Sequence, residues 1–411
     1  MCIEPVSGSG SVRRTVLLTG GRAPCTLELA RAFHDAGHRV LVAESARRHL
    51  CRVSRAVERS FVVSPPNGDT AAFVGELEAI VSRERVDVLI PTCEEIFFVA
   101  KGLERLKQHC AVWAAPIGEL DGLHNKWRFV QLARGMGLQV PETVLVTDRD
   151  EWLALAEGPW LEESLVLKPA YSRFASKVLF LDQNTSADQR RRVLEHAVPA
   201  LSPEAPWVVQ RRIEGRHLAT YSITYKGHLL VHGAYPCRYR LGQGASVYFE
   251  PVRHDRSKAW VQKLVQATGF TGQIAFDFIE EDNGGLYALE CNPRATSGIH
   301  LFHGKSGLTD AFLQPEALCD AGLVVEPADS SGTMLTVPML AAGISGTRSL
   351  PQLRDWLRAV RSGRDAVFHR RDLAPGLEQL RVVMDAWRTA RSLGISLTEA
   401  TTIDLEWNGE P

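Results

Sequence analysis

Apolar and polar positions alternate along the first 115 residues in blocks that predict strands and helices in turn. Short apolar runs, typical of buried strands, occur at residues 15–18, 39–43, 61–63, 86–90 and 111–114. Between these runs, apolar residues recur with a helical period, at residues 27–36, 71–83 and 96–108. Strands that alternate with helices favour a parallel sheet covered on both faces. We therefore expect residues 1–115 to form a Rossmann-like α/β domain.

A different pattern, at residues 273–294, predicts a β-hairpin that carries metal ligands. Two apolar strands are joined by a polar turn at residues 281–285. Asp277 lies in the first strand, and Glu290 and Asn292 lie two residues apart at the end of the second, so their side chains leave the same face. Carboxylate and amide oxygens suit Mg²⁺, with Mn²⁺ as an alternative. Arg294 follows as a fixed cation that can reach a phosphoryl or carboxylate group.

The segment ECNPRATSG at residues 290–298 resembles the metal-binding signature E-x-N-P-R of the ATP-grasp superfamily. The resemblance is closest to the carbamoyl-phosphate-synthase-like carboxylate–amine ligases. An ordinary hairpin with a solvated acidic turn is the alternative. Further matching segments follow in the order of the family between Lys126 and Arg294.

Two lysines match the phosphate-binding positions of that family. Lys168 ends an apolar strand and is followed by a polar loop, which resembles the family's mobile loop but contains no glycine. The resemblance implies that Lys126 and Lys168 neutralise ATP phosphates, that Ser172 and Arg173 in the loop help to hold them, and that Lys168 and Arg294 are catalytic. For each lysine the alternative is an ordinary surface residue at the end of a strand or the start of a helix.

Residues 207–223 resemble the hinge strand that binds the nucleotide base. The resemblance implies that the adenine lies against Gln210, Arg211, Arg212 and Ile213. His217 takes the position at which the family usually has the acid that binds the ribose, and Glu214 is a second candidate for that role. A neutral histidine can still form a hydrogen bond with a hydroxyl group.

The acceptor substrate is expected to meet a second group of residues. Arg238 and Arg240 alternate onto one face of a strand that leans over the acceptor pocket in related ligases, and they could bind a carboxylate or an acyl phosphate. The alternative interpretation is that both arginines are solvated charges on an edge strand and bind no substrate. Glu94 and His300 are further candidates, although Glu94 could equally stabilise the start of a helix.

A dinucleotide-binding domain is an alternative interpretation of the first 115 residues. Gly20 and Gly21 follow the first strand, and Glu44 closes the second, where a ribose-binding acid would lie. The turn lacks the third glycine that close packing of helix and strand requires, so the dinucleotide fingerprint fails.

Length, charge and cysteine content restrict the class of protein. A chain of 411 residues is too long for one core. The net charge of −1 favours neither nucleic acid nor an anionic membrane as a partner, and no apolar run approaches the ~20 residues that span a bilayer. The eight cysteines are scattered without C-x-x-C spacing, which is typical of free thiols in a reducing compartment. We expect a cytoplasmic protein. The sequence does not decide between a monomer and a homodimer.

The expected architecture combines α/β and α+β units. It comprises a Rossmann-like domain at residues 1–115, the two lobes of an ATP-grasp domain at 116–200 and 201–329, and a small C-terminal α+β module at 330–411. In this module, residues 334–340 and 401–407 have the pattern of strands, and residues 350–360 and 377–393 have that of helices. The sequence assigns the module no chemistry.

The resemblance implies an ATP-dependent carboxylate–amine ligase with ATP and Mg²⁺ as cofactors. Such an enzyme would join a small carboxylic acid to an amine, for example two amino acids, through an acyl phosphate and release ADP and phosphate. The first alternative is a carboxylase or synthetase that activates bicarbonate. The second is a non-catalytic ATP-binding regulatory protein, which the glycine-poor loop and His217 would favour.

Overall fold

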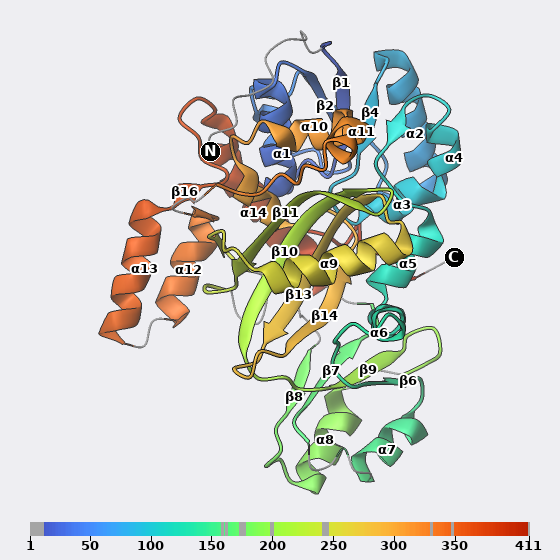
Figure 1. Cartoon of the computed structure of the whole chain (residues 1–411), viewed down its shortest axis with the longest axis vertical. Helices are drawn as coiled ribbons and strands as arrows, with labels where there is room; N and C mark the ends of the chain where they lie inside the picture. The colour runs from blue at the N-terminus through green and yellow to red at the C-terminus, as the bar shows by residue number, and fades with distance from the viewer. Residues whose placement is uncertain are drawn as a thin grey trace.

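The computed structural model describes residues 12–157, 160, 163–171, 178–197, 201–240, 246–328, 332–346 and 349–409. Figure 1 shows the N-terminal domain at the top, a central antiparallel sheet, a small lobe at the bottom and helical elements of the C-terminal module at the left. No helix among the described residues is both long and apolar enough to cross a bilayer. All seven cysteines in the described ranges are free thiols.

The N-terminal domain is a five-stranded parallel sheet with the strand order β3-β2-β1-β4-β5. Its strands are β1 (Thr15–Thr19), β2 (Arg39–Glu44), β3 (Arg59–Val62), β4 (Val88–Ile90) and β5 (Ala111–Val112). The helices that accompany them are α1 (Pro24–Asp35), the 3-10 helix η1 (Leu50–Val53), α2 (Thr70–Glu84), α3 (Glu95–Lys101) and α4 (Leu103–Leu106). The central strand β1 is completely buried at Val16, Leu17 and Leu18, as a parallel sheet covered on both faces requires. The predicted Rossmann-like fold is confirmed.

The order of this sheet reverses between β1 and β4, so the loops that follow these two strands meet in a crevice at its carboxyl edge. Gly20, directly after β1, has a φ of +72° and lies so close to the other loop that a Cβ atom would be 2.8 Å from Thr92 Oγ1. Glycine is therefore required at this position.

The small lobe is an antiparallel sheet with the order β6-β9-β7-β8. Two helices, α5 (Ile117–His124) and α6 (Lys126–Gly135), lead into it from the first domain. The lobe itself consists of β6 (Thr143–Val146), α7 (Arg149–Glu157), β7 (Leu165–Pro169), β8 (Leu179–Leu181), α8 (Ala187–Ala197) and β9 (Trp207–Arg211). Trp152, Leu167 and Trp207 pack in its separate core.

The large lobe is a second antiparallel sheet, with the order β11-β10-β13-β14. It contains β10 (Arg216–Tyr225), β11 (His228–Pro236), α9 (Asp255–Thr268), β13 (Gly272–Glu280), β14 (Leu286–Asn292), the 3-10 helix η3 (Ser297–Phe302), α10 (Gly307–Leu313) and α11 (Pro315–Asp320). The predicted hairpin is confirmed as β13 and β14. Helix α9 covers one face of the sheet, where Trp260 packs edge-on against Phe276 and Phe278.

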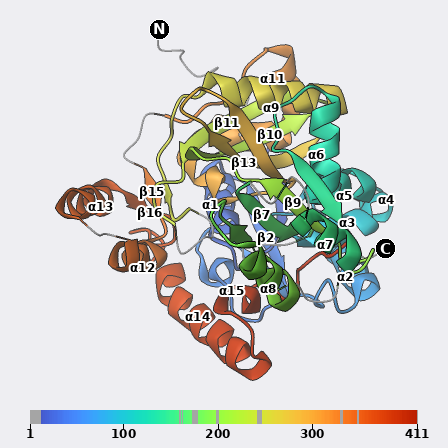
Figure 2. The same ribbon diagram turned by 90° about the horizontal axis from the view of Figure 1, so that it is seen from below.

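The C-terminal module shares a small sheet with the large lobe. The short strands β12 (Tyr248–Phe249), β15 (Thr333–Met334) and β16 (Arg364–Asp365) lie in the order β12-β15-β16. The helices of the module are α12 (Thr336–Gly346), α13 (Leu350–Ser362), α14 (Ala374–Leu393) and α15 (Leu397–Ala400). Figure 2 shows α14 along the lower edge of the molecule and α13 at the far left, away from α14.

The predictions of two strands in this module are wrong. The apolar run at residues 334–340 is strand only at its first position and then continues as α12, and residues 401–405 form turns. A short apolar run does not by itself distinguish a strand from a buried helix. The two predicted helices of the module are confirmed as α13 and α14.

Candidate active site

The hairpin brings the proposed metal ligands to one place. Asp277 on β13 lies directly opposite Glu290 on β14, and both residues line the same cavity as Asn292. Burial and the adjacent Glu290 carboxylate together raise the pKa of Asp277 to about 8. Burial would also raise the pKa of Glu290, but Lys126 and Lys168 outweigh it and lower this pKa to about 2. Two carboxylates that repel each other in a half-buried position suit a bound cation.

The chemistry of this donor set fits a hard divalent ion. All three side chains offer oxygen atoms, which Mg²⁺ prefers to nitrogen or sulfur. Within the described ranges, no group of three or more His, Cys, Asp and Glu side chains is arranged to hold a metal. A metal at Asp277 and Glu290 would therefore depend on the Asn292 amide and on oxygen atoms of the substrate or water to complete its ligands.

Two buried lysines from different elements face these carboxylates. Lys126 is the first residue of α6 and is 3% exposed, and its Nζ lies 3.7 Å from Glu290 Oε2. Lys168 on β7 is 6% exposed, and its Nζ donates a hydrogen bond of 3.2 Å to the carbonyl oxygen of Leu289. Burial lowers the pKa of Lys168 to about 8, although Glu290 acts in the opposite direction. The site therefore pairs two ammonium groups with two carboxylates.

The cavity has a volume of about 1770 Å³ and extends from the hinge strand to the N-terminal domain. That volume exceeds the range of roughly 300–1,000 Å³ for a site that holds one small ligand. Its walls come from four parts of the chain: the N-terminal domain, both lobes and the C-terminal module. The cavity therefore has room for a nucleotide and a second substrate together.

Residues Gln210 to Ile213 line the hinge end of the cavity, as the sequence predicts. The Gln210 side chain is occupied, because its Nε2 donates to Thr143 Oγ1 at 3.0 Å. The guanidinium groups of Arg211 and Arg212 are also held, by Glu163 at 2.8 Å and by Asp182 at 2.6 Å. Contacts of these three residues with a nucleotide would therefore come from the backbone.

His217 also lines the cavity, at the start of β10. Burial and, to a smaller extent, the nearby Arg240 together lower the pKa of His217 to about 4. The ring is therefore neutral near pH 7 and can take part in a hydrogen bond with a hydroxyl group. Ser172 and Arg173, predicted to hold phosphates, lie outside the described residues.

Arg294 lies at the junction between the metal ligands and the rest of the cavity. One of its terminal nitrogens donates to Asn292 Oδ1 at 3.0 Å and lies 3.4 Å from Glu94 Oε1. Its Nε is buried and has no hydrogen-bond partner among the described residues. Glu94 is fully buried behind Arg294 and also accepts a hydrogen bond of 3.4 Å from the backbone of Trp407. Glu94 thus positions Arg294, and in the described chain it does not form part of the cavity wall.

Arg238 and Arg240 do not share one surface, contrary to expectation. Arg240 lines the cavity, whereas Arg238 forms an exposed ion pair of 2.6 Å with Glu250. The alternation predicted for them requires a continuous strand, and β11 ends at Pro236. Only Arg240 remains a candidate for binding the acceptor.

His300 lies away from the cavity, which is a second departure from the sequence prediction. It is buried in η3, where its Nδ1 bonds to Glu28 Oε2 at 2.8 Å. His303 and Arg364 bind the same carboxylate at 2.6 Å and 2.9 Å. Glu28 belongs to α1, so this cluster joins the first domain to the large lobe and the C-terminal module.

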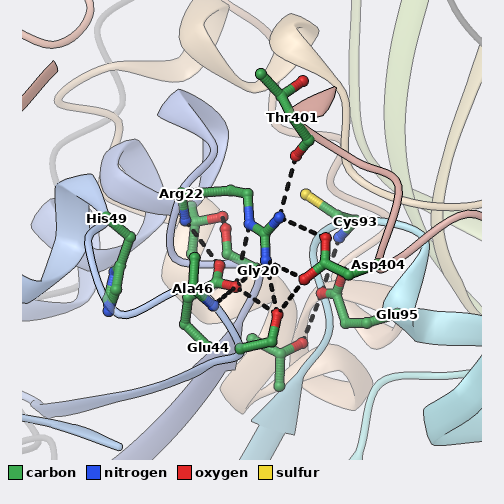
Figure 3. A network of polar contacts seen from close by, with 12 residues as sticks. Gly20, Arg22, Glu44, Ala46, His49, Cys93, Glu95, Thr401 and Asp404 are labelled. Atoms are coloured by element: carbon green, nitrogen blue, oxygen red, sulfur yellow. Dashed lines mark hydrogen bonds and ion pairs between the residues drawn. The ribbon is translucent and has the colours of Figure 1, made fainter. Parts of the chain in front are cut away.

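No pattern in the sequence predicts the residues that the C-terminal segment contributes to the cavity. Figure 3 shows Arg22 at the centre of a network with Glu44, Thr401 and Asp404. Arg22 donates to Asp404 Oδ1 at 2.7 Å, to the Thr401 carbonyl oxygen at 3.1 Å and, through Nε, to Glu44 Oε1 at 3.1 Å. Because Glu44 is held in this way, the structure does not favour it as a ribose ligand of a dinucleotide.

Trp407 fixes the same segment further along the chain. Its ring stacks on Phe97 at a centroid distance of 5.5 Å, and its Nε1 donates to Asp121 Oδ1 at 3.1 Å. Residues 400–405 line the cavity between Trp407 and α14. The C-terminal segment therefore forms part of the cavity wall together with the N-terminal domain.

Comparison with known proteins identifies the domain that carries this site. Residues 123–298 match the family model of the ATP-grasp domain. The carbamoyl phosphate synthase large chain of Clostridium beijerinckii is 24% identical over 225 residues, which is 53% of this chain and 20% of that protein. The chain spans less than half the length of the curated relatives it matches.

Solved structures show the same fold over a larger part of the chain. An L-amino acid ligase from Bacillus licheniformis superposes with a TM-score of 0.56 at 16% identity and covers 74% of each chain. N5-carboxyaminoimidazole synthetase from Staphylococcus aureus, complexed with ADP, gives a TM-score of 0.54 at 14% identity over 72% of this chain and 75% of that one. Residues 123–298 therefore carry an ATP-grasp domain, as the motifs of the sequence indicated.

Proposed function

We propose that the protein is an ATP-dependent carboxylate–amine ligase that forms an amide or peptide bond and releases ADP and phosphate. The observation that carries this proposal is the meeting of Lys126 and Lys168 with Asp277 and Glu290 in one cavity. Buried cations beside a pair of carboxylates suit a triphosphate with its metal. The size of the cavity supports a second substrate beside the nucleotide.

The chemistry follows from the need for a leaving group. A carboxylate does not react with an amine, because its leaving group would be oxide. An oxygen of the substrate carboxylate instead attacks the γ-phosphorus of ATP, the bond to the bridging oxygen breaks, and ADP leaves. The amine then attacks the acyl carbon, phosphate leaves, and the amine gives up a proton as the amide forms. Neither step needs a nucleophile from the protein.

The protein would contribute position and charge. Asp277, Glu290 and Asn292 would hold Mg²⁺ or Mn²⁺, which offsets phosphate charge when bound. Lys126 and Lys168 would bind phosphate oxygens, and Arg294, kept in place by Glu94, would stabilise the charge on the transferred group. The hinge backbone at Arg211–Ile213 would receive the base and His217 the ribose.

Steady-state release of ADP tests this function. With Mg²⁺ present, pools of amino acids should stimulate ADP release, and the product should contain a new amide bond. The name of the L-amino acid ligase that shares the fold makes amino acids the first pool to try. Release with bicarbonate alone would favour a carboxylase, and ATP binding without release in any pool would favour a regulatory protein.

Arg240→Ala is expected to raise the Michaelis constant for the acid by roughly ten-fold or more, because an Arg–carboxylate hydrogen bond contributes ~1.5–3 kcal/mol. The Michaelis constant for ATP should stay within about two-fold, because the nucleotide would lie toward the hinge. The measurement is ADP release with each substrate varied in turn. Arg238→Ala is the matched control, since this arginine pairs with Glu250 at the surface. An effect of Arg238→Ala equal to that of Arg240→Ala would contradict the assignment.

A further inference from the structure

Helix α14 has two faces with different surroundings. On one face Pro375, Glu378, Ala386 and Ala390 are buried against the rest of the chain. Val382, Asp385 and Thr389, on the same side of the helix, line the cavity. The residues on this face of α14 therefore either pack against the rest of the protein or form part of the cavity wall.

The opposite face of α14 is apolar and exposed. Leu373, Leu377, Leu380, Met384 and Trp387 follow one another at steps of four, three, four and three residues, and we name them the α14 seam. Their exposed fractions run from 47% at Trp387 to 72% at Leu377. Arg391 continues the spacing and lies over the Trp387 ring, 5.0 Å from its centroid. Apolar residues at this spacing form the contact line of paired helices.

The apolar area is too large for the free surface of an ordinary monomer. Two further exposed side chains, Phe368 and Val383, lie beside the seam. If a large side chain has ~200 Å² of surface, the exposed parts of the seven amount to on the order of 700 Å². Monomeric proteins rarely expose apolar patches of more than a few hundred Å². About 800 Å² per partner is what a stable interface between two proteins requires.

The charges beside the seam are nearly balanced, because α14 carries two acids and three arginines and so has a net charge of only +1. Arg381 pairs with Glu378 at 3.0 Å, and Arg388 pairs with Asp385 at 3.3 Å. The rim therefore carries neither the cationic excess that an anionic membrane or nucleic acid would need nor a strong charge of either sign that would repel an identical surface.

We propose that the α14 seam is the interface of a homodimer, in which it packs against the same seam of a second copy. A seam with a regular repeat is complementary to itself, as a two-fold interface requires. Association would bury the apolar face and leave the other face of α14 in the cavity wall. It would thereby hold that wall in place, so the dimer would support the site without contributing residues to it.

Sedimentation velocity of the full-length protein, without substrate, tests the proposal independently of any enzymatic activity. We expect a species of twice the chain mass of 45.4 kDa at micromolar concentration. Leu380→Glu and Met384→Glu should each raise the dimer dissociation constant by roughly 30-fold or more, because each places a charge in the centre of the seam. Both positions are exposed in the single chain, so circular dichroism and the melting temperature of the monomer should confirm an intact fold.

Leu350→Glu provides the matched control. Leu350 is an exposed leucine at the start of α13, 79% accessible, on a helix that lies apart from α14 in Figure 2. It should leave the dimer unchanged. A wild-type protein that stays monomeric up to 100 µM, a dimer that persists in both seam variants, or a dimer that Leu350→Glu disrupts would each overturn the proposal.

Discussion

Replacing Glu290 with glutamine should reduce ATP turnover by about 100- to 1,000-fold, which is the loss typical when a group that stabilises the reacting charges is removed. Glu290 faces Asp277 across the hairpin and lies 3.7 Å from the Lys126 ammonium group. Glutamine keeps the shape of the side chain but takes away one anionic ligand. The metal and the phosphates that depend on it would then be misplaced.

The fold should survive this change, because the Glu290 side chain is 34% exposed and glutamine is isosteric. Asp282→Asn is the matched control: it removes a carboxylate from the exposed turn of the same hairpin and should leave turnover unchanged. ADP release and the melting temperature should be measured on both variants. A Glu290→Gln protein with near-wild-type turnover would show that the metal site lies elsewhere.

Lys168→Met is expected to raise the dissociation constant for Mg·ATP by roughly 10- to 100-fold, because a charge-assisted hydrogen bond in a buried site contributes ~1.5–3 kcal/mol. Methionine retains much of the volume and the flexibility of the side chain. Lys126→Met should have a smaller effect. Lys168 projects from a paired strand near its end and is held at the Leu289 carbonyl, whereas Lys126 begins a helix.

Isothermal titration of Mg·ATP measures the two affinities directly. Lys263→Met on the exposed side of α9 is a suitable control, since it removes the same charge at a distance from the cavity. An equal loss for all three variants would indicate a general electrostatic effect. A loss for Lys126→Met that exceeds the loss for Lys168→Met would reverse the assigned roles.

Much of the fold could be predicted from the sequence because it depends on local patterns. The alternation of strands and helices in the first domain follows from the period of apolar residues, and the hairpin follows from two such runs around a polar turn. The opposition of Asp277 and Glu290 follows from the pairing of those two strands. The superfamily could be recognised for the same reason, since its signature lies within one hairpin.

The same reasoning failed where a pattern was too short or a strand ended early. Residues 334–340 contain too few positions to separate a strand from a helix, and most of them begin α12. The sequence predicts one shared face for Arg238 and Arg240 only if the pleat is regular, and the strand ends at Pro236. The position of His300 after the signature predicts a place near the acceptor, but Glu28 of α1 binds it elsewhere.

The sequence by itself determined the elements and the residues of the hairpin, because contacts between neighbours in the chain set a period that can be read without the fold. Only the tertiary structure decided how the cavity is closed. Arg22 and Asp404 meet although they lie 382 positions apart in the sequence, and Trp407 reaches Glu94 from near the other end of the chain. Which distant segments pack together depends on the shapes and the unpaired polar groups of whole surfaces, and no local spacing records that choice.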